Sequence, residues 1–376
     1  MIRLLLIIFL PLSSMNLQGR KWSPELITKQ SILENHLKLI PEPLFEGLTQ
    51  LVYVTTWNPR GYMLARKRAS RLAYVSPVWF DLEPIFDEND IMVNVNIMGK
   101  KNINPDFIQS LRKTNPDIKI VPRFYFNEFQ PSALDRFIKQ ESVTQKVAQT
   151  IANFCRQYGF DGLVLDPYSA LADAISKPDY KRESLETIEH LGNVLRRNSL
   201  VTILSFPALV SFIEETDEKI KSISYITMAE CASLLDSFDH LHLWTYSEAL
   251  KGNRRFVHNE FLHKNIEHCG FSPKIMIGIN FYGSEFDLTG YYSTMASEAK
   301  PVISKRFLEV LKDNESILTF NEKTMEHELT LVRNNSLIFY PSLTTLENRL
   351  TIVQEYNVGI AIWEYGQGLD YFTNLI

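Results

Sequence analysis

The sequence predicts a closed (β/α)8 barrel with a small α+β insert between its seventh and eighth strands. Two observations carry this prediction. Eight short and nearly continuous apolar runs recur along the chain, as strands do when a parallel sheet is buried on both faces. Segments with apolar residues at helical spacing lie between these runs, and strands that alternate with helices indicate an α/β fold.

The strand runs start after a polar N-terminal region and continue to the end of the chain. Their predicted ranges are Leu51–Trp57, Leu72–Phe80, Ile118–Phe126, Gly162–Asp166, Leu200–Pro207, Leu241–Tyr246, Ile275–Tyr282 and Gly359–Glu364. A doubly wound open sheet is the alternative to a barrel. It is disfavoured because no glycine-rich phosphate loop follows the first run.

Three helices between the strands are predicted by clear apolar stripes. They span Ser142–Gln157, Arg182–Asn198 and Leu343–Tyr356. The first opens with Ser and, three residues later, Gln, which is the pattern of a capping box. We expect each stripe to face the sheet rather than a partner protein.

The interval between Tyr282 and Leu343 is too long for one loop and one helix, because it holds about sixty residues. Within it, Asn334-Asn335 separates two β-rich runs, Glu328–Val332 and Leu337–Tyr340, and this arrangement predicts a β-hairpin. We therefore expect an insert at about residues 284–341 inside a barrel domain of residues 50–376.

The first residues have the features of a signal peptide. One positive charge at Arg3 precedes the apolar run Leu4–Leu10, and small residues follow. We expect residues 1–19 to be removed and residues 20–49 to form a leader that packs on the barrel. The mature protein is then expected to be secreted or lumenal, in the extracellular space or the lysosome.

Two sequons and three cysteines are compatible with that route. Asn314 and Asn334 each begin an Asn-x-Ser sequence, so both are candidate N-glycosylation sites. Cys155, Cys231 and Cys269 allow at most one internal disulfide, whose pairing the sequence leaves open. Cys155 lies on an apolar helix stripe, where we expect a buried free thiol.

Composition excludes several classes of protein. A chain of 376 residues with 45% hydrophobic residues can build a full core, so it is not disordered throughout. With a net charge of −5 and no basic run, nothing indicates nucleic-acid binding. No internal apolar stretch is long enough to span a bilayer, so we do not expect an integral membrane protein.

No metal site and no cofactor site are predicted. The histidines show no His-x-x-x-His spacing on a helix. His240 and His242 share one face of the sixth strand, but no Cys or carboxylate is spaced to join them as ligands. We expect both to be core histidines.

In a barrel of this kind, function lies at the C-terminal ends of the strands. Aromatic residues and one carboxylate gather at these ends: Trp57, Asp166, Tyr168, Tyr246, Tyr282 and Trp363. Aromatic faces can stack on sugar rings, while carboxylates and phenol hydroxyls can bind sugar hydroxyl and amide groups. These residues therefore predict a sugar-binding groove, although the same side chains could simply close the top of the barrel.

Several of these strand ends resemble one enzyme family. Phe160–Tyr168 resembles the Asp-Gly-x-Asp-x-Asp-x-Glu motif of family 18 glycoside hydrolases, the chitinase-like barrels. Phe238-Asp239 with Thr245-Tyr246 is similar to their sixth strand, Gly278–Gly283 to the seventh, and Trp363 to the eighth-strand tryptophan. The resemblance extends from about residue 50 to the C-terminus and implies the same barrel fold.

The departures from the family motif bear on activity. In the family, the final Glu protonates the leaving oxygen and the Asp two positions earlier orients the substrate's acetamido group, whose oxygen attacks the anomeric carbon. Carried over, Tyr168 stands at the acid position, Val164 at the middle Asp, and Asp166 keeps the orienting position. Tyr246 matches the sixth-strand tyrosine, but Ser247 replaces the Asp that usually follows it.

A phenol is a poor general acid, since its unperturbed pKa is about 10 against about 4.3 for Glu. Loss of a positioned acid costs roughly 10²–10⁴-fold in rate. The resemblance therefore implies a catalytically degenerate barrel, without a catalytic residue, that binds chitin-like oligosaccharides containing N-acetylglucosamine. Two alternatives stay open: a weak glycoside hydrolase that uses Glu128 or Glu364 as its acid, and a protein-interaction module with its own receptor.

Overall fold

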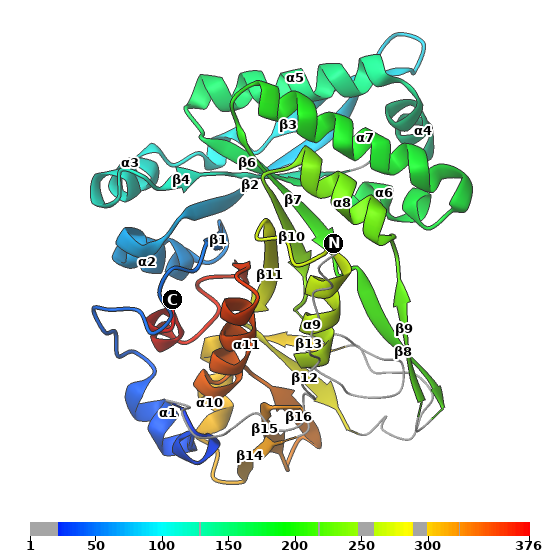
Figure 1. Ribbon diagram of the computed structural model, residues 1–376. Coiled ribbons are helices and arrows are strands. Elements are labelled where there is room, and N and C mark those ends of the chain that lie inside the picture. The colour runs from blue at the N-terminus through cyan, green and yellow to red at the C-terminus, as the bar shows by residue number, and fades with distance from the viewer. Residues whose placement is uncertain (1–21, 128, 217–218, 247–258, 289–298, 323) are drawn as a thin grey trace, which may run out of the picture.

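The computed structural model describes residues 22–127, 129–216, 219–246, 259–288, 299–322 and 324–376, with the backbone alone for 212–216 and 219–221. Eight parallel strand positions, one of them shared by β4 and β5, form the closed barrel that the sequence predicts (Figure 1). Closure is direct, because the first strand pairs with both the second and the last. The barrel strands are β1 (Gln50–Thr55), β2 (Tyr74–Phe86), β4 with β5 (Lys119–Ile120 and Arg123–Phe126), β6 (Gly162–Asp166), β7 (Val201–Pro207), β10 (His240–Trp244), β11 (Ile275–Asn280) and β17 (Gly359–Trp363).

Helices surround the barrel wall. They are α2 (Pro59–Arg68), α3 (Pro105–Thr114), α4 (Pro131–Lys139), α5 (Glu141–Tyr158), α6 (Tyr168–Ile175), α7 (Pro178–Arg197), α8 (Met228–Ser237), α9 (Asn259–His268) and α11 (Leu343–Glu355). Short 3-10 turns are η1 (Pro24–Leu26), η2 (Ala69–Arg71), η3 (Lys100–Asn102) and η4 (Asp370–Asn374). The apolar stripes of the helices and the outward side chains of the strands form one large core between the two layers.

A second and smaller core fills the inside of the barrel. It consists of Leu51, Tyr53, Val121, Val164, Ile203, Met276 and Ala361. On β6, the neighbours Leu163 and Leu165 belong to the outer core while Val164 belongs to the inner one, as expected when successive side chains alternate across a sheet. This alternation also directs Asp166 inward.

The start of α5 differs from the prediction. The helix begins at Glu141 with Gln140 as its N-cap, and no side chain caps it. Gln140 is at the same time the C-cap of α4, so the two helices share one turning residue. Ser142 therefore lies inside the first turn, and the predicted capping box is wrong.

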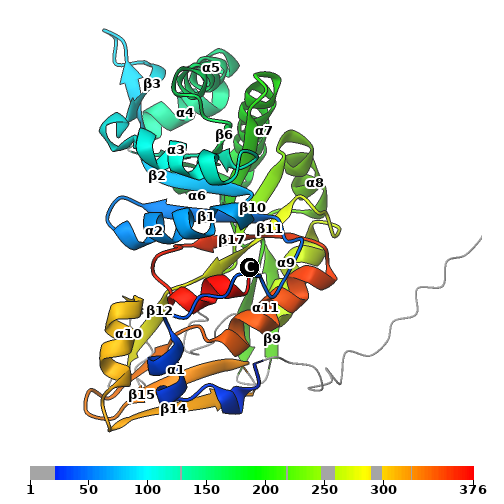
Figure 2. The same cartoon turned by 90° about the vertical axis from the view of Figure 1, so that its left-hand side faces the viewer.

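Two hairpins extend the barrel, and neither was predicted from the sequence. The second strand continues past Phe80 and pairs antiparallel with β3 (Met92–Met98), and this hairpin projects from the barrel in Figure 2. After β7, the strands β8 (Val210–Thr216) and β9 (Lys219–Ser224) form a separate two-stranded sheet. The acidic residues and the proline at positions 81–84 interrupt the apolar run of β2, and the predicted strand therefore ended at Phe80.

In its described residues, the insert between β11 and β17 is a five-stranded antiparallel sheet with one helix. Its elements are β12 (Gly283–Asp287), β13 (Lys300–Val302), α10 (Ser304–Leu311), β14 (Ser316–Asn321), β15 (Glu326–Leu331) and β16 (Ser336–Phe339), in the sheet order β13-β12-β16-β15-β14. The predicted hairpin forms between β15 and β16. Figures 1 and 2 both place this sheet beside the barrel, next to α1 (Lys29–Asn35).

The described part of the leader contacts three regions of the fold. Lys29 Nζ donates to the backbone oxygen of Ser316 in the insert, at 2.8 Å. The backbone N–H of Trp22 donates to Glu347 on α11 at 3.0 Å. The backbone N–H of Phe45 donates to the oxygen of Leu375 at 2.8 Å, so the leader holds the insert and the C-terminal segment together.

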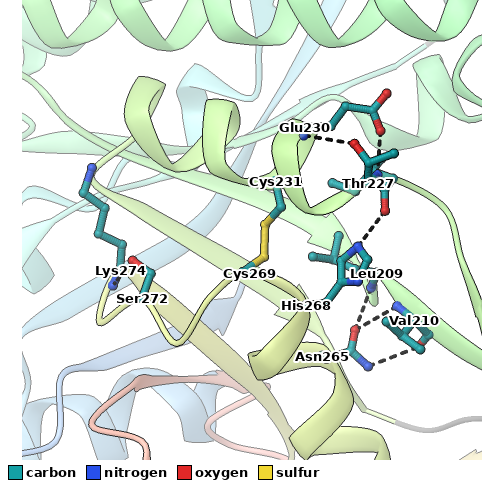
Figure 3. The surroundings of a disulfide bond; sticks show 11 residues. Leu209, Val210, Thr227, Glu230, Cys231, Asn265, His268, Cys269, Ser272 and Lys274 are labelled. Carbon is teal, nitrogen blue, oxygen red and sulfur yellow. Dashed lines mark hydrogen bonds between the residues drawn. A yellow bond between two sulfur atoms is a disulfide. The ribbon is translucent and has the colours of Figure 1, made fainter. Parts of the chain in front are cut away.

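A disulfide joins Cys231, in the first turn of α8, to Cys269, which follows α9 (Figure 3). Cys155 is a buried free thiol. Asn265 on α9 lies beside this link and is fully buried. Its amide accepts from the backbone N–H of Leu209 at 2.7 Å and donates to the oxygen of Val210 at 3.1 Å. Together these contacts fix α9 against α8 and the base of the β8–β9 hairpin.

The predicted signal peptide lies outside the described residues. Among the described helices, none combines the length and apolar character that crossing a membrane requires.

Candidate functional site at the barrel mouth

The candidate site is the mouth of the barrel, where the parallel strands end. The register between β5 and β6 places Arg123 beside Val164 and Tyr125 beside Asp166. Val164 is fully buried in the inner core, so the position that matches the family's middle Asp is apolar. Asp166 lies one layer nearer the mouth.

Asp166 is held by a single cation. Its Oδ2 accepts from Arg123 Nε at 2.7 Å, and the carboxylate is 4% exposed. The other oxygen, Oδ1, is buried without a hydrogen-bond partner in the described structure. Burial raises the pKa of Asp166, and the Arg123 guanidinium opposes that rise by stabilising the charged form.

Arg123 is fixed by aromatic rings as well as by the carboxylate. Its guanidinium carbon lies 4.6 Å from the ring centre of Tyr125 and 5.6 Å from that of Trp363. Both contacts are cation–π interactions, which favour a planar guanidinium over a flexible ammonium. The mouth therefore carries a permanent positive charge next to Asp166.

A hydrogen-bonded network occupies the opposite wall. His242 Nδ1 lies 2.8 Å from the hydroxyl of Tyr53, and its Nε2 lies 2.9 Å from the hydroxyl of Tyr246. Burial lowers the pKa of His242 to about 3, with a further contribution from Arg123, so this imidazole is neutral. The sequence reading of a core histidine fits this placement, and the network fixes the hydroxyl of Tyr246.

Aromatic rings connect the two walls. The ring of Trp363 lies 5.1 Å from that of Tyr53, and the ring of Tyr246 lies 6.5 Å from that of Tyr282. Four of the predicted binding residues, which are Asp166, Tyr246, Tyr282 and Trp363, thus belong to one connected group through Arg123, Tyr53 and His242.

Tyr168, at the position of the family acid, is the first residue of α6. Its ring packs edge-on against Phe206 at 5.3 Å and Trp244 at 5.7 Å. Burial raises the pKa of Tyr168 above its ordinary value, so the phenol keeps its proton. Trp244 Nε1 donates to Ser205 Oγ, and this hydroxyl oxygen lies 3.4 Å from His242 Nδ1. Tyr168 is thus linked to the network through its ring contact with Trp244.

Trp57 is not part of this group. It follows the end of β1, is 63% exposed, and makes no ring contact with another described residue. An exposed indole at the end of a barrel strand can stack on a ligand, but the structure does not bring it to the other five predicted residues.

Glu364, one of the two alternative acids, points away from the mouth. Its carboxylate is fully buried and accepts from Asn58 Nδ2 at 2.7 Å and from the backbone N–H of Gly366 at 3.3 Å. A Cβ at Gly61 would lie 2.4 Å from Glu364 Oε1, so only glycine lets α2 approach the carboxylate this closely. Burial raises the pKa of Glu364 to about 7, but no substrate can reach it in this position. The other acid, Glu128, and Ser247 lie outside the described residues.

A cavity of about 600 Å³ opens beside the mouth, between β5, α4 and α6. Tyr125, which stacks on Arg123, forms part of its wall, together with Phe129, Ser169 and Tyr180. Its size is within the range of small-ligand sites. In the described part of the chain, no three His, Cys, Asp or Glu side chains are grouped so as to hold a metal ion.

Sequence reasoning missed Arg123, Tyr53 and Tyr125 as members of the site. Arg123 was the available signal, because it is a cation between apolar and aromatic residues in the middle of a run that was predicted to be a buried strand, whereas the other cation of the run, Lys119, lies near its start. A buried cation needs a partner. Its partner depends on the register of two strands, which the sequence alone does not specify.

A comparison with known protein families gives the same reading of the fold. Residues 50–368 match the family model described as "Glycosyl hydrolases family 18". The chain belongs to this family. The match covers the whole barrel up to the turn after β17.

Solved structures of family 18 proteins have the same fold at low identity. A chitinase from Chromobacterium violaceum aligns with a TM-score of 0.66 and 13% identity, over 88% of this chain and 98% of that one. An N-acetylglucosaminidase of the family from Paenibacillus barengoltzii aligns at 0.63 and 17%, over 88% and 98%. A mutant plant class V chitinase from Cycas revoluta, solved with (GlcNAc)3, aligns at 0.64 and 14%, over 87% and 98%.

Proposed function

We propose that this family 18 barrel binds chitin-like oligosaccharides containing N-acetylglucosamine and does not cleave them. The observation that carries the proposal is the pairing of Asp166 with Arg123, 2.7 Å apart, in a mouth where Tyr168 stands at the acid position. In the family mechanism the orienting Asp stabilises a cationic intermediate. Here the Arg123 guanidinium is already paired with that carboxylate, and a second positive charge close to the guanidinium is disfavoured.

In the described part of the mouth, no side chain is a suitable general acid, and this supports the same conclusion. Tyr168 keeps its proton because burial raises its pKa. Glu364 is enclosed beneath α2, so the geometry does not favour the alternative of a hydrolase that uses this residue. A barrel without a proton donor at the scissile bond forfeits the acid's share of catalysis.

The retained groups support binding of a sugar chain. Trp363 and Tyr282 offer aromatic faces, and Tyr246 offers a fixed hydroxyl. Trp57 is exposed at the same end of the barrel, and the cavity beside Tyr125 has room for further sugar units. Among the structural neighbours, one chitinase is described in complex with (GlcNAc)3 and a mutant of it with (GlcNAc)4.

The proposal is tested by calorimetric titration of the full chain with chitotetraose. Tyr246→Phe removes one hydroxyl from the mouth and should lower the affinity roughly 3- to 10-fold, the value of one hydrogen bond. Tyr74→Phe is the matched control, because Tyr74 bonds His240 at 3.1 Å at the opposite end of the barrel, and its affinity should be that of the wild type. No heat of binding at millimolar ligand would reject the sugar-binding function and favour a protein-interaction module.

We also propose that the protein is secreted or lumenal, in the extracellular space or the lysosome. The disulfide between Cys231 and Cys269 supports an oxidising compartment. Asn314 and Asn334 are both exposed on turns of the insert, as glycosylation requires. Expression through a secretory pathway should give a mass that falls in two steps when Asn314→Gln and Asn334→Gln are combined, and an unchanged mass would contradict glycosylation.

Within the family, we propose that the chain is most similar to chitinase domain-containing protein 1. The similarity lies in three segments, Val75–Trp79, Ile120–Arg123 and Ile362–Phe372. The second of these contains Arg123, the residue that pairs with the orienting Asp166.

Profiling of an unbiased glycan array beside N-acetylglucosamine oligomers would test whether the ligand is chitin-like.

A further inference from the structure

The outer face of the insert sheet carries exposed apolar side chains. The register of its strands places four residues opposite one another in a row: Phe286, Leu337, Thr330 and Ile317. Side chains directly opposite in antiparallel strands lie on the same face. Leu329, next to Thr330, is fully buried, so the row points away from the core. Ile317 is 53% exposed at the end of this row.

Val332 adds a second exposed side chain to this face. It follows β15 two residues after Thr330, so it continues the alternation on the outer side. It is 54% exposed and is the diagonal neighbour of Ile317 across the two strands. Ile317 and Val332 are called the apolar pair below.

The apolar pair lies at an open edge of the sheet. β14 is the last strand in the described sheet order, and no described strand pairs with its outer side. Lys29 binds one carbonyl of this strand, that of Ser316. An edge strand with exposed apolar side chains tends to pair with another chain unless something covers it. Figures 1 and 2 place β14 at the margin of the molecule opposite α5.

Both glycosylation sequons flank the apolar pair. Asn314 lies three residues before one member of the pair, and Asn334 lies two residues after the other. Both asparagines are exposed. Arg333 donates through Nε and Nη2 to the two carboxylate oxygens of Glu315, each at 2.7 Å. Because Glu315 belongs to the first sequon and Arg333 precedes the second, this pairing holds the two turns together.

We propose that N-linked glycans at Asn314 and Asn334 cover the apolar pair and the β14 edge, and that this cover prevents self-association through the insert. The proposal rests on the glycosylation proposed above and is independent of sugar binding at the mouth. N-linked glycans are bulky and solubilising. Their sugar rings can bury the apolar pair with one face and expose hydroxyl groups to water.

The test uses the full chain secreted from a eukaryotic host and compares the wild type with Asn314→Gln/Asn334→Gln. Intact-mass spectrometry counts the glycans first. Light scattering should then give a wild-type mass that is independent of concentration, whereas the mass of the glycan-free variant should roughly double as concentration rises. Binding of a hydrophobic dye to the variant should increase several-fold, as expected for a newly exposed apolar surface.

Two further variants show whether the apolar pair causes the association. Adding Ile317→Thr and Val332→Thr to the glycan-free variant should restore the constant mass. Ile303→Thr is the matched control, because Ile303 is 43% exposed and follows β13 at the other edge of the insert sheet. In the glycan-free variant it should leave the association unchanged. If the glycan-free variant fails to fold in a thermal melt, the folded wild type is trimmed enzymatically to one N-acetylglucosamine per site, and its mass should again rise with concentration.

The outcomes separate this proposal from the others. A wild type without glycans would overturn both the glycosylation and the cover. If the wild type is glycosylated but the glycan-free variant keeps a constant mass, the glycosylation stands and the cover is overturned. Association that Ile303→Thr reverses as well as the double threonine variant does would also overturn it. None of these measurements uses chitotetraose, so they leave the sugar-binding function to its own test.

Discussion

At the scale of single residues, two features of the mouth, and not only the missing acid, bear on hydrolysis. Tyr168 lacks the acidity of Glu, and Asp166 is in addition paired with the Arg123 guanidinium at 2.7 Å. Either feature alone would weaken substrate-assisted hydrolysis. Together they mean that restoring one group should not restore the reaction.

We therefore expect Tyr168→Glu to gain little activity. A positioned acid is worth roughly 10²–10⁴-fold in a competent site, but here Asp166 stays paired with Arg123 and Val164 stays apolar. Release of fluorophore from a chitobiose substrate between pH 4 and 7 should rise less than tenfold above the wild type. Turnover at an ordinary enzymatic rate of about 1–10³ per second would show that the acid alone was missing.

Glu364 gives the stability of the fold a pH dependence. Burial raises its pKa from 4.5 to about 7 in the folded state. Between these values the folded state holds a proton that the unfolded chain has lost, so the free energy of unfolding falls as pH rises through this window. The fall attributable to Glu364 amounts to about 3 kcal/mol at most, and it levels off above the folded pKa.

Urea unfolding of Glu364→Gln at pH 4.5, 6 and 7.5 measures this contribution, because Gln cannot titrate. The slope of unfolding free energy against pH should be less negative than in the wild type. Glu315→Gln, at an exposed carboxylate paired with Arg333, should keep the wild-type slope. Equal slopes in Glu364→Gln and the wild type would mean that Glu364 is charged in the folded protein.

At the scale of elements, the disulfide connects two helices that flank β10. It closes a loop whose ends are 38 residues apart in sequence. The double variant Cys231→Ser/Cys269→Ser should lose about 2–4 kcal/mol of unfolding free energy, chiefly because the unfolded chain gains freedom. Denaturant unfolding of the wild type in reductant should match that of the variant.

Cys155→Ala is the control for the disulfide. It removes the buried free thiol and leaves the link intact, so its stability should still fall when reductant is added. If reductant leaves the wild type unchanged, the link does not contribute to stability.

The cavity between α4 and α6 should matter for long ligands only. Ser169 lines it and is exposed, so Ser169→Trp fills the cavity without disturbing the core. The affinity for chitohexaose should fall several-fold while that for chitobiose stays the same. Ser176→Trp, at the exposed C-cap of α6 and not among the residues that line the cavity, should change neither. Equal losses for both ligands would place the short ligand in the cavity as well.

At the scale of the whole molecule, the barrel was predictable and the chemistry of its mouth was only partly so. Continuous apolar runs such as Ile275–Tyr282 are a local property of the chain, and they predicted all eight strand positions of the barrel. The β8–β9 hairpin was missed because its strands mix charged and apolar residues. The Arg123–Asp166 pair was missed because it depends on how two strands align, which no local pattern contains.

The described leader contacts the insert, α11 and the C-terminal segment, and so ties together parts of the chain that lie beside the barrel. Lys29, Trp22 and Phe45 make the contacts that join them. Arg349 on α11 joins the insert to the mouth, because its guanidinium donates to Asn280 at 2.9 Å and pairs with Glu326 of the insert. The end of β11, next to Tyr282, is thereby held by a side chain of α11 that is itself fixed by the insert.

The central claim is that the mouth binds a chitin-like chain and leaves it intact, and ligand-observed NMR of chitotetraose with stoichiometric protein tests both parts in one sample. We predict broadened ligand signals between pH 4 and 7 and no new reducing-end signals after a day. Steady appearance of chitobiose signals would contradict the account, as would sharp and unshifted chitotetraose signals at every pH.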